Sequence, residues 1–376
     1  MADNMGGNRA GKYEVVRNRS GMADAGGRLY YQTYIPADLK WVDESPFASD
    51  ELKNRLNAIY REIGRQQGLG FYEDDFKRKN VQLYKQELVA VLQNKKSFVE
   101  LSDIFGFRTT NEISGKLEFY GAMGDKDSFT CMDILMGMVE IQKKPYRFRK
   151  HQIWEESSVR RISLREHNPP APERIMDLMM DLDDYRRRET EADMMVRAAL
   201  LCYQFLTIMP YEEDNEIWAS ILLNRFLREQ GCELGYYIPF AKYFLGQDEN
   251  RKNLMKQVRE EEDYHSWIVF FLQVVEDSLT QTNRTIMQLE RIHKDTLSVI
   301  SGEKQKALLA KILAYMEEYP IFIIGDIEKT FDVAYNTAAK AVLMLEKKGL
   351  VKEISHKQRY RIYSYDRYMK ELIKRI

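Results

Sequence analysis

The segment from residue 194 to residue 208 is apolar on nearly every side and reads Met-Met-Val-Arg-Ala-Ala-Leu-Leu-Cys-Tyr-Gln-Phe-Leu-Thr-Ile. A surface helix carries a polar stripe, so a helix without one is stable in water only when other elements enclose it. We therefore expect this segment to be a central helix. Pro210 ends it, an acidic loop follows, and an amphipathic helix is expected from about residue 216 to residue 230.

Segments with helical periodicity precede and follow this helix and are candidates to enclose it. Apolar residues recur at helical spacing over residues 50–67, 73–93, 172–185 and 250–294. Over residues 150–170 the pattern changes to short alternating stretches and ends in several prolines, which predicts a hairpin or an extended flap. The expected fold class is therefore mainly α, a helical bundle with a β-hairpin flap.

The two ends of the chain differ from this helical middle. Glycines are frequent among the charged residues of positions 1–34, and such a composition buries little surface and loses much entropy on ordering. We expect a flexible arm there, a helical region over 35–145, a domain over 146–300 that contains the loop 209–220, and a further domain over 301–376. Ser301-Gly302 marks the last of these boundaries.

Whole-chain composition excludes several classes of protein. The 57 basic and 58 acidic side chains nearly cancel, so neither a generally basic nucleic-acid binder nor an acidic tail protein is encoded. The three cysteines form no Cys-x-x-Cys pair, which argues against a disulfide framework or a zinc knuckle. No apolar signal segment and no run of 18 apolar residues is present. We expect a cytoplasmic protein without a membrane partner.

Residues 303–376 are basic, with 15 Lys or Arg against 10 Asp or Glu, a net charge of +5, whereas the rest of the chain carries −6. Helices are expected over 307–319, 326–331 and 336–348, followed by strands over 350–355 and 360–365, the order of a winged helix-turn-helix. The alternative is a protein-docking or dimerisation module, and a homodimer is compatible with either. The residues expected to contact DNA are Asn336, Thr337, Lys340, Lys347, Lys357, Arg359 and Arg361, with Tyr335 beside them.

The loop after the central helix is strongly acidic. A helix N-terminus ordinarily attracts an anion such as a phosphate through its free N–H groups and its dipole. Here four carboxylates crowd that point, at positions Glu212, Glu213, Asp214 and Glu216. We expect them to cap the following helix and to repel a triphosphate unless metal ions intervene.

Residues 209–220, Met-Pro-Tyr-Glu-Glu-Asp-Asn-Glu-Ile-Trp-Ala-Ser, resemble the Fic family motif H-x-F-x-[D/E]-G-N-G-R-x-x-R. Family members transfer AMP from ATP to a hydroxyl of a target protein. The resemblance aligns Met209 with the catalytic histidine, Tyr211 with phenylalanine and Glu213 with the metal-binding acid. Asn215 is retained. The positions that differ in the phosphate site are Asp214 and Glu216 in place of the glycines and Ile217 and Ser220 in place of the arginines.

The surroundings resemble the family more closely than the motif does. Residues 148–154, with Ile153 and Trp154 at their end, resemble the start of the family's target-binding flap, and residues 168–174 resemble its proline-rich end. Residues 110–115 resemble an autoinhibitory helix of pattern [S/T]-x-x-x-E-[G/N], with Thr110 at its first position. Ser114 replaces the glutamate and Ser220 its arginine partner, so both charges of that pair are lost. The appended winged helix is similar to that of many bacterial relatives.

The resemblance implies a protein that has lost catalysis, because a methionine thioether cannot accept the hydroxyl proton that the histidine takes. We expect no cofactor and a function of binding DNA, or binding a partner protein, for instance as a strand added to the flap. The alternative is an active nucleotidyl or phosphoryl transferase with a rebuilt site. That site would bind ATP and Mg²⁺ through Glu213 and Asn215 and would take its base from His151 or His167.

Overall fold

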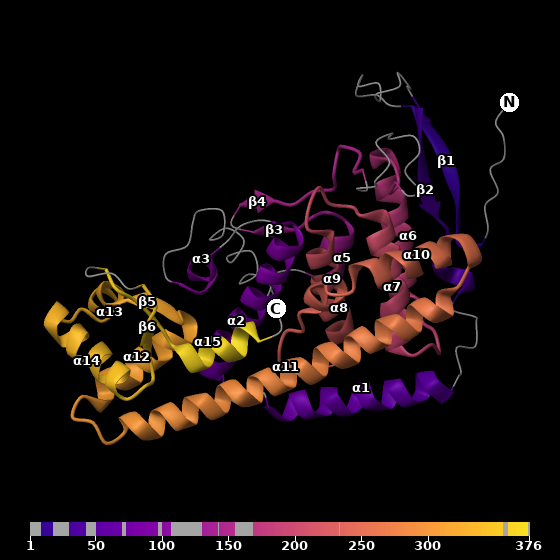
Figure 1. Cartoon of the computed structure of the whole chain (residues 1–376). Coiled ribbons are helices and arrows are strands. Elements are labelled where there is room, and N and C mark those ends of the chain that lie inside the picture. Colours follow the sequence, from indigo (N-terminus) through magenta and orange to yellow (C-terminus); the bar gives the residue numbers. More distant parts are fainter. Residues whose placement is uncertain are drawn as a thin grey trace. The chain divides into compact units, whose positions relative to one another are not determined.

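The structure, a computed structural model of the 376-residue chain, is mostly helical, as the periodicity predicts (Figure 1). It describes residues 9–17, 30–42, 50–69, 73–96, 100–106, 130–141, 143–154, 168–232, 234–355 and 360–374. Two compact units divide the chain, and each is made of several segments. The first contains residues 1–61, 127–233 and 243–277, and the second contains 62–126, 234–242 and 278–376.

The first unit begins with two antiparallel strands, β1 (Gly11–Arg17) and β2 (Tyr30–Pro36), where the sequence predicted a flexible arm. The difference has a physical reason in β2, whose Tyr-Tyr-Gln-Thr-Tyr-Ile-Pro is rich in residues that favour strands. Tyr31 and Tyr34 are buried, so the strand contributes to the core of the unit. The prediction of a flexible arm relied on the glycine content and did not take these buried tyrosines into account.

Helix α7 (Met194–Ile208) is the centre of the first unit, as predicted, and every residue from Met195 to Ile208 is buried. It packs against α6 (Ile175–Arg187), α8 (Asn215–Glu229) and β2. Trp267, near the start of α11 (Tyr264–Ile300), donates its indole N–H to the carbonyl of Ala199 at 2.8 Å. Enclosure on all sides explains why this helix needs no polar stripe.

Shorter elements complete the first unit. They are the 3₁₀ turns η1 (Leu39–Trp41) and η3 (Pro172–Arg174), the helices α5 (Cys131–Leu135) and α10 (Asp248–Glu261), and the strand pair β3 (Glu140–Ile141) and β4 (Lys144–Pro145). Two helices, α1 (Asp50–Leu69) and α9 (Phe240–Leu245), together with α11, contribute residues to both units.

Helix α2 (Glu73–Asn94) organises the second unit through buried polar side chains. Gln82 and Lys85 donate to the last carbonyls of α12 (Lys306–Glu318), at Glu317 and Glu318, both at 2.8 Å. Elsewhere on α2, Asn80 accepts the N–H of Tyr237 and Glu87 accepts the N–H of Ala241, again at 2.8 Å. The helix also contacts α3 (Leu101–Phe105) and α15 (Asp366–Ile373). The basic carboxyl-terminal segment is therefore packed into this unit.

That segment contains α12, α13 (Ile324–Phe331) and α14 (Tyr335–Lys347), within one or two residues of the expected bounds. Its three strands, β5 (Ile321–Ile323), β6 (Lys352–Glu353) and β7 (Ile362–Ser364), form an antiparallel sheet in the order β5-β7-β6. The sequence predicted the last two strands at greater length and missed β5 and α15. Three residues give no periodicity from which a strand can be recognised.

Several expected features lie outside the described residues. They are residues 155–167 of the flap with His167, the autoinhibitory-like residues Thr110 and Ser114, and the basic residues Lys357 and Arg359. Within the described ranges, none of the helices combines the length and apolarity needed to cross a bilayer.

Candidate functional site

The loop between α7 and α8 begins and ends on residues with left-handed backbone. Met209 ends α7 with φ 48°, and Asp214 precedes α8 with φ 60°. Aspartate is one of the few non-glycine residues that adopt this conformation readily, whereas for methionine it costs energy. Asp214 thus supplies backbone geometry that a glycine would adopt without strain, and Met209 is held by its surroundings.

Asn215 fixes the loop from within. Its side-chain oxygen accepts the N–H of Tyr211 at 3.0 Å, and its side-chain amide donates to the carbonyl of Tyr211 at 2.9 Å. Both ends of the amide are therefore used by backbone, and the residue is buried. Asn215 acts as an internal brace of the turn.

Tyr211 anchors the loop to the core of the unit. Its ring stacks on Trp218 with centroids 4.2 Å apart and meets Phe148 edge-on at 5.8 Å. Its hydroxyl donates to the carbonyl of Ile134 at 2.6 Å, and burial raises the pKa of this hydroxyl. The hydroxyl that distinguishes tyrosine from phenylalanine is thus used to satisfy a buried carbonyl.

Arg149 lies beneath the loop with only 2% of its surface exposed. Its guanidinium donates to the carbonyls of Met209 at 2.8 Å, His151 at 3.0 Å and Ile208 at 3.4 Å, and also to that of Pro170. Its own N–H donates to the carbonyl of Pro210 at 2.8 Å. Burial lowers the pKa of this guanidinium to about 10, against an opposing effect of Glu212. One side chain thereby joins the motif loop to the segments on either side of residues 155–167.

Glu212 and Glu216, two of the four acidic residues, are held by N–H or positively charged partners. Glu212 accepts the N–H of Lys150 at 2.9 Å, and its Oε1 lies 3.1 Å from Nδ1 of His151. Partial burial opposes ionisation of Glu212, yet these hydrogen bonds lower its pKa. Glu216 is paired with Arg251 on α10 at 3.4 Å.

Arg251 also binds Asp248, so this buried guanidinium serves two carboxylates. Burial works against its charge, but Glu216 and Asp248 raise its pKa.

The capping predicted for the acidic residues is not found at Asp214, whose side chain makes no capping hydrogen bond to α8. Glu213 is exposed. Within the described residues, no group of three or more His, Cys, Asp or Glu side chains is arranged to hold a metal ion.

Ile217 and Ser220 lie inside the protein, with 2% and 0% of their surfaces exposed. Both belong to the first turns of α8, whose side chains there face the core. Neither side chain can reach a ligand in the solvent without a change of structure. At the predicted phosphate site, two of the residues that would touch phosphate are therefore core residues.

The described ends of the flap lie against β2. Trp154 meets Tyr31 edge-on at 4.8 Å, and the hydroxyl of Tyr31 donates to Gln152 at 3.3 Å. At the other end, Asn168 accepts the N–H of Tyr34 at 3.0 Å and donates to the carbonyl of Gln32 at 2.8 Å. Trp154 and its neighbour Ile153 are half-buried. The residues expected at the flap thus rest on a strand that the sequence did not predict.

Residues 133–227 match the Fic/DOC family. The matched segment includes the whole loop 209–220 and begins before residue 146, where the sequence predicted the start of a domain. A crystal structure of a Fic family protein from Desulfovibrio desulfuricans G20 is also similar, with 18% identity, 84% of this chain and 96% of that chain covered, and a TM-score of 0.47.

Two residues that hold the loop 209–220 and its surroundings were missed by sequence reasoning. Arg149 was considered only within the resemblance of residues 148–154, and no local pattern indicated that its guanidinium binds backbone carbonyls. Arg251 is 35 positions after Glu216 in the chain, and only the docking of α10 brings them together. No local signal could have predicted that ion pair.

The predicted DNA-binding residues lie together on α14 only in part. Asn336, Lys340 and Lys347 are exposed, and Thr337 is half-buried. Arg361, at the start of β7, is exposed and lies 3.6 Å from Glu353.

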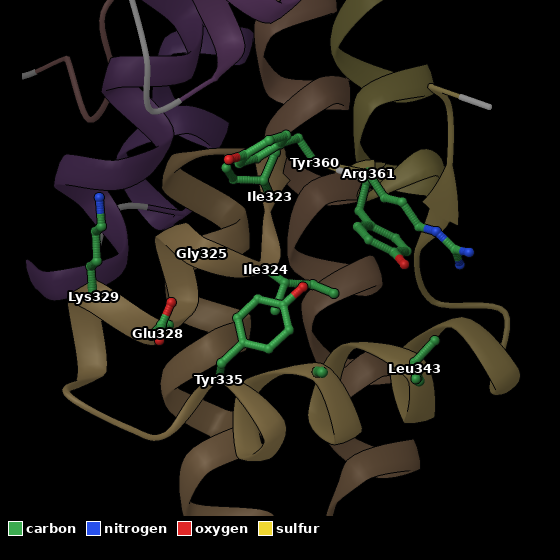
Figure 2. Close-up of a pocket in the computed structure, with 11 residues that line it drawn as sticks. Ile323, Ile324, Gly325, Glu328, Lys329, Tyr335, Leu343, Tyr360 and Arg361 are labelled. Carbon is green, nitrogen blue, oxygen red and sulfur yellow. The ribbon is translucent and has the colours of Figure 1, made fainter. Parts of the chain in front are cut away.

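Beside α14 the structure has a pocket of about 560 Å³ formed by α13, α14, β5 and the residues before β7 (Figure 2). Tyr335 and Leu343 of α14 and Tyr360 line it and are exposed. Lys329 and Arg361 lie on opposite sides of it in Figure 2. The pocket therefore combines apolar and aromatic walls with charged residues of both signs, because Glu328 also lines it.

Proposed function

We propose that this chain is a Fic-family protein that transfers no nucleotide and that acts by binding duplex DNA through its carboxyl-terminal segment. The burial of Ile217 and Ser220 is the observation that carries the first part. These residues stand where the family motif has arginines, and a polyphosphate needs such cations close by to offset its charge. Met209 adds to the argument, because its thioether cannot act as a general base.

The alternative of a rebuilt catalytic site has less support. Both ends of the Asn215 amide bind Tyr211 and the residue is 2% exposed, so a metal ion in the solvent does not reach its oxygen unless the turn moves. Nδ1 of His151 lies 3.1 Å from Glu212, but the side chain is 84% exposed, so a base at this position would act in solvent and not in an enclosed site. His167 lies outside the described residues. No second base is found at the loop among the residues with described positions.

The DNA-binding part rests on element order and charge. The order α12-β5-α13-α14-β6-β7 with a three-stranded sheet is that of a winged helix, in which α14 would be the recognition helix. Its exposed Asn336, Lys340 and Lys347 have the chemistry that base edges and phosphates require. The segment carries a net charge of +5 in a chain that is otherwise acidic.

A second candidate function, protein docking by the same segment, is favoured by the pocket of Figure 2. Tyr335, Leu343 and Tyr360 expose apolar surface around it, and aromatic residues are enriched at protein interfaces. DNA and a protein ligand would compete for this face. A duplex that does not bind at any salt concentration would favour the second candidate.

Nucleotide binding is the first property to test. A ligand at 100 times its dissociation constant adds about 2.7 kcal/mol to the free energy of unfolding. We expect ATP with Mg²⁺ to leave the thermal midpoint unchanged and labelled ATP to transfer no label to the protein or to lysate proteins. Met209→His should remain inactive because the phosphate contacts are still missing. Transfer of label by the natural chain would refute the proposal.

DNA binding is tested separately by titrating a library of short duplexes into the full chain. Binding through lysines and arginines releases counterions, so the logarithm of affinity should fall linearly with the logarithm of salt concentration. Affinity that does not respond to salt would contradict a basic contact surface. The ATP result and the DNA result are independent, so either half of the proposal can fail alone.

A further inference from the structure

The outer edge of β1 is the surface from which a further inference follows. In an antiparallel pair, residues alternate between pairs that exchange hydrogen bonds and pairs that do not. Tyr34 lies opposite Tyr13 but donates its N–H to Asn168, so Tyr13 and Tyr34 form a pair without mutual hydrogen bonds. Ala37 donates to Ala10 at 2.8 Å, which fixes the same alternation from the other end.

It follows that Lys12, Glu14 and Val16 direct their backbone groups to β2, whereas Tyr13, Val15 and Arg17 direct theirs away from it. Figure 1 shows β1 on the outside of β2. Within the described parts of the chain, the three outward N–H groups have no hydrogen-bond acceptor. An edge strand with open N–H and C=O groups is a template for another strand.

The side chains at this edge are partly apolar. Val15 is 66% exposed, and Tyr30, on the neighbouring strand, is 57% exposed. Exposed apolar side chains beside an open strand edge favour a protein partner that adds a strand. The sequence of β1, Gly-Lys-Tyr-Glu-Val-Val-Arg, decides which strand fits best.

We propose that β1 pairs antiparallel with β1 of a second copy of this chain, centred on Val15. The outward groups of Tyr13, Val15 and Arg17 would then meet the same groups of the partner in reverse order. Val15 would face its own copy, and Tyr13 would face Arg17 across the interface. Aromatic rings and guanidinium groups attract each other, and the two valines cover each other's exposed surface.

The alternation of hydrogen-bonding groups also permits the two registers next to the Val15 register. Both bring less favourable side-chain pairs together. Centring on Glu14 would place two carboxylates directly opposite each other, and like charges in that position are destabilising. Centring on Val16 would shift Tyr13 beyond the end of the partner's strand and remove the contact with Arg17. The Val15 register is therefore the self-complementary one.

The association would be weak, because seven-residue strands paired by their edges bury much less than the roughly 1,200–2,000 Å² of stable interfaces. A covalent trap is the appropriate measurement for such a dimer. All three native cysteines, Cys131, Cys202 and Cys232, are buried, so an introduced thiol can be studied without interference. Directly opposed residues that exchange hydrogen bonds have Cα atoms about 5.5 Å apart, within the range that a disulfide spans.

The experiment oxidises the full-length Val15→Cys protein under mild conditions and measures the disulfide-linked dimer on a non-reducing gel. Tyr30→Cys is the matched control, because Tyr30 is nearly as exposed but lies on β2. In the proposed dimer the two β2 strands are three strand spacings apart, roughly 14 Å, too far for a disulfide. We expect at least about tenfold more dimer from Val15→Cys, because pairing raises the effective thiol concentration.

Equal cross-linking of the two variants, or none from Val15→Cys, would overturn the proposal. A third variant, Val15→Pro, removes only an outward N–H, and proline is tolerated on edge strands. It should abolish concentration-dependent dimer in sedimentation of the full chain while far-UV circular dichroism stays unchanged. If deletion of residues 1–8 is needed before Val15→Cys cross-links, those residues occupy the edge and the homodimer is refuted for the natural chain.

Discussion

The Nε–H of Arg149 donates to the carbonyl oxygen of Met209 at 2.8 Å, at the residue where α7 ends in a left-handed conformation. A left-handed methionine is unfavourable in isolation, so this hydrogen bond helps to hold the start of the motif loop. The same guanidinium binds carbonyls before and after residues 155–167. The loop and the segments on either side of residues 155–167 are therefore one hydrogen-bonded assembly.

Arg149→Lys should destabilise the protein by at least about 2 kcal/mol, because a single ammonium cannot reach all of the carbonyls and each orphaned buried acceptor costs about 1–3 kcal/mol. Arg147→Lys is the matched control, since Arg147 also donates to two backbone carbonyls, at 3.2 Å, but is exposed. Urea unfolding followed by circular dichroism measures both. Equal stabilities of the two variants would show that the assembly does not depend on the guanidinium.

Tyr211→Phe restores the residue of the family motif and yet should lower the free energy of unfolding by about 1 kcal/mol. The reason is the carbonyl of Ile134, which would lose the 2.6 Å hydrogen bond from the hydroxyl and would keep the longer, 3.3 Å hydrogen bond from the N–H of Gly137. Tyr360→Phe, at an exposed position, provides the control and should be neutral. A Tyr211→Phe protein as stable as the natural chain would show that the N–H of Gly137 alone satisfies the carbonyl of Ile134.

Ser220→Arg replaces a fully buried serine by the family's arginine. Because α8 directs this position into the core, the guanidinium would be buried without a designed partner, and we expect a loss of more than about 3 kcal/mol. Asn250→Arg on the exposed side of α10 should change stability by less than about 0.5 kcal/mol. Thermal unfolding of the two variants compares them directly, and a stable Ser220→Arg protein would mean that the position can open to solvent.

The sequence predicted the central helix because its apolar pattern is complete over fifteen residues and needs no partner to be recognised. It predicted the helices of the carboxyl-terminal segment from the helical spacing of their apolar residues. It missed β1 and β2 because glycines and charges dominate the composition around them, while the burial of Tyr31 and Tyr34 depends on α7. A pattern in the sequence predicts the local secondary structure, but it does not predict burial by an element that is distant in the chain.

The motif loop shows the same limit for the candidate site. Residue identities sufficed to predict that Met209 cannot act as a base and that the motif arginines are lost. They did not show that Glu216 forms an ion pair with Arg251, or that the side chain of Asn215 is hydrogen-bonded to the backbone of Tyr211. The negative charge of the loop is thus smaller than four carboxylates imply. The argument against ATP binding therefore depends on the buried positions of Ile217 and Ser220.

Lys85 makes the stability of the second unit dependent on pH. Burial lowers the pKa of its ammonium to about 8, below the roughly 10.4 of an unfolded chain. Between these values the unfolded state binds more protons, so the free energy of unfolding rises with pH. From pH 7 to pH 9.5 this group should add about 2 kcal/mol.

Lys85→Met should lack this gain, so its stability relative to the natural chain should fall by about 2 kcal/mol over that range. Lys311→Met, at an exposed position on α12, is the control. Its free energy of unfolding should differ from that of the natural chain by the same amount at every pH. Urea titrations at pH 7, 8, 9 and 9.5 provide the comparison. A constant difference between the natural chain and Lys85→Met would show that Lys85 keeps an ordinary pKa.

Lys340→Ala tests whether α14 contacts DNA. If Lys340 binds a phosphate, its removal should weaken binding to all duplexes to a similar extent and reduce the slope of log affinity against log salt by about 1. Lys311→Ala removes an equal charge from α12 and should leave the slope unchanged, because that helix is not expected at the DNA. The comparison separates a specific contact from the general effect of net charge.

Leu343→Asp tests whether the face of α14 beside the pocket meets DNA. Leu343 lines that pocket and is exposed, so the change should not unfold the helix, but it places a carboxylate on the face expected to meet DNA (Figure 2). Like-charge repulsion from phosphates should then lower DNA affinity at least as much as Lys340→Ala does. Unaltered DNA binding by Leu343→Asp and Lys340→Ala together would exclude α14 as the recognition helix.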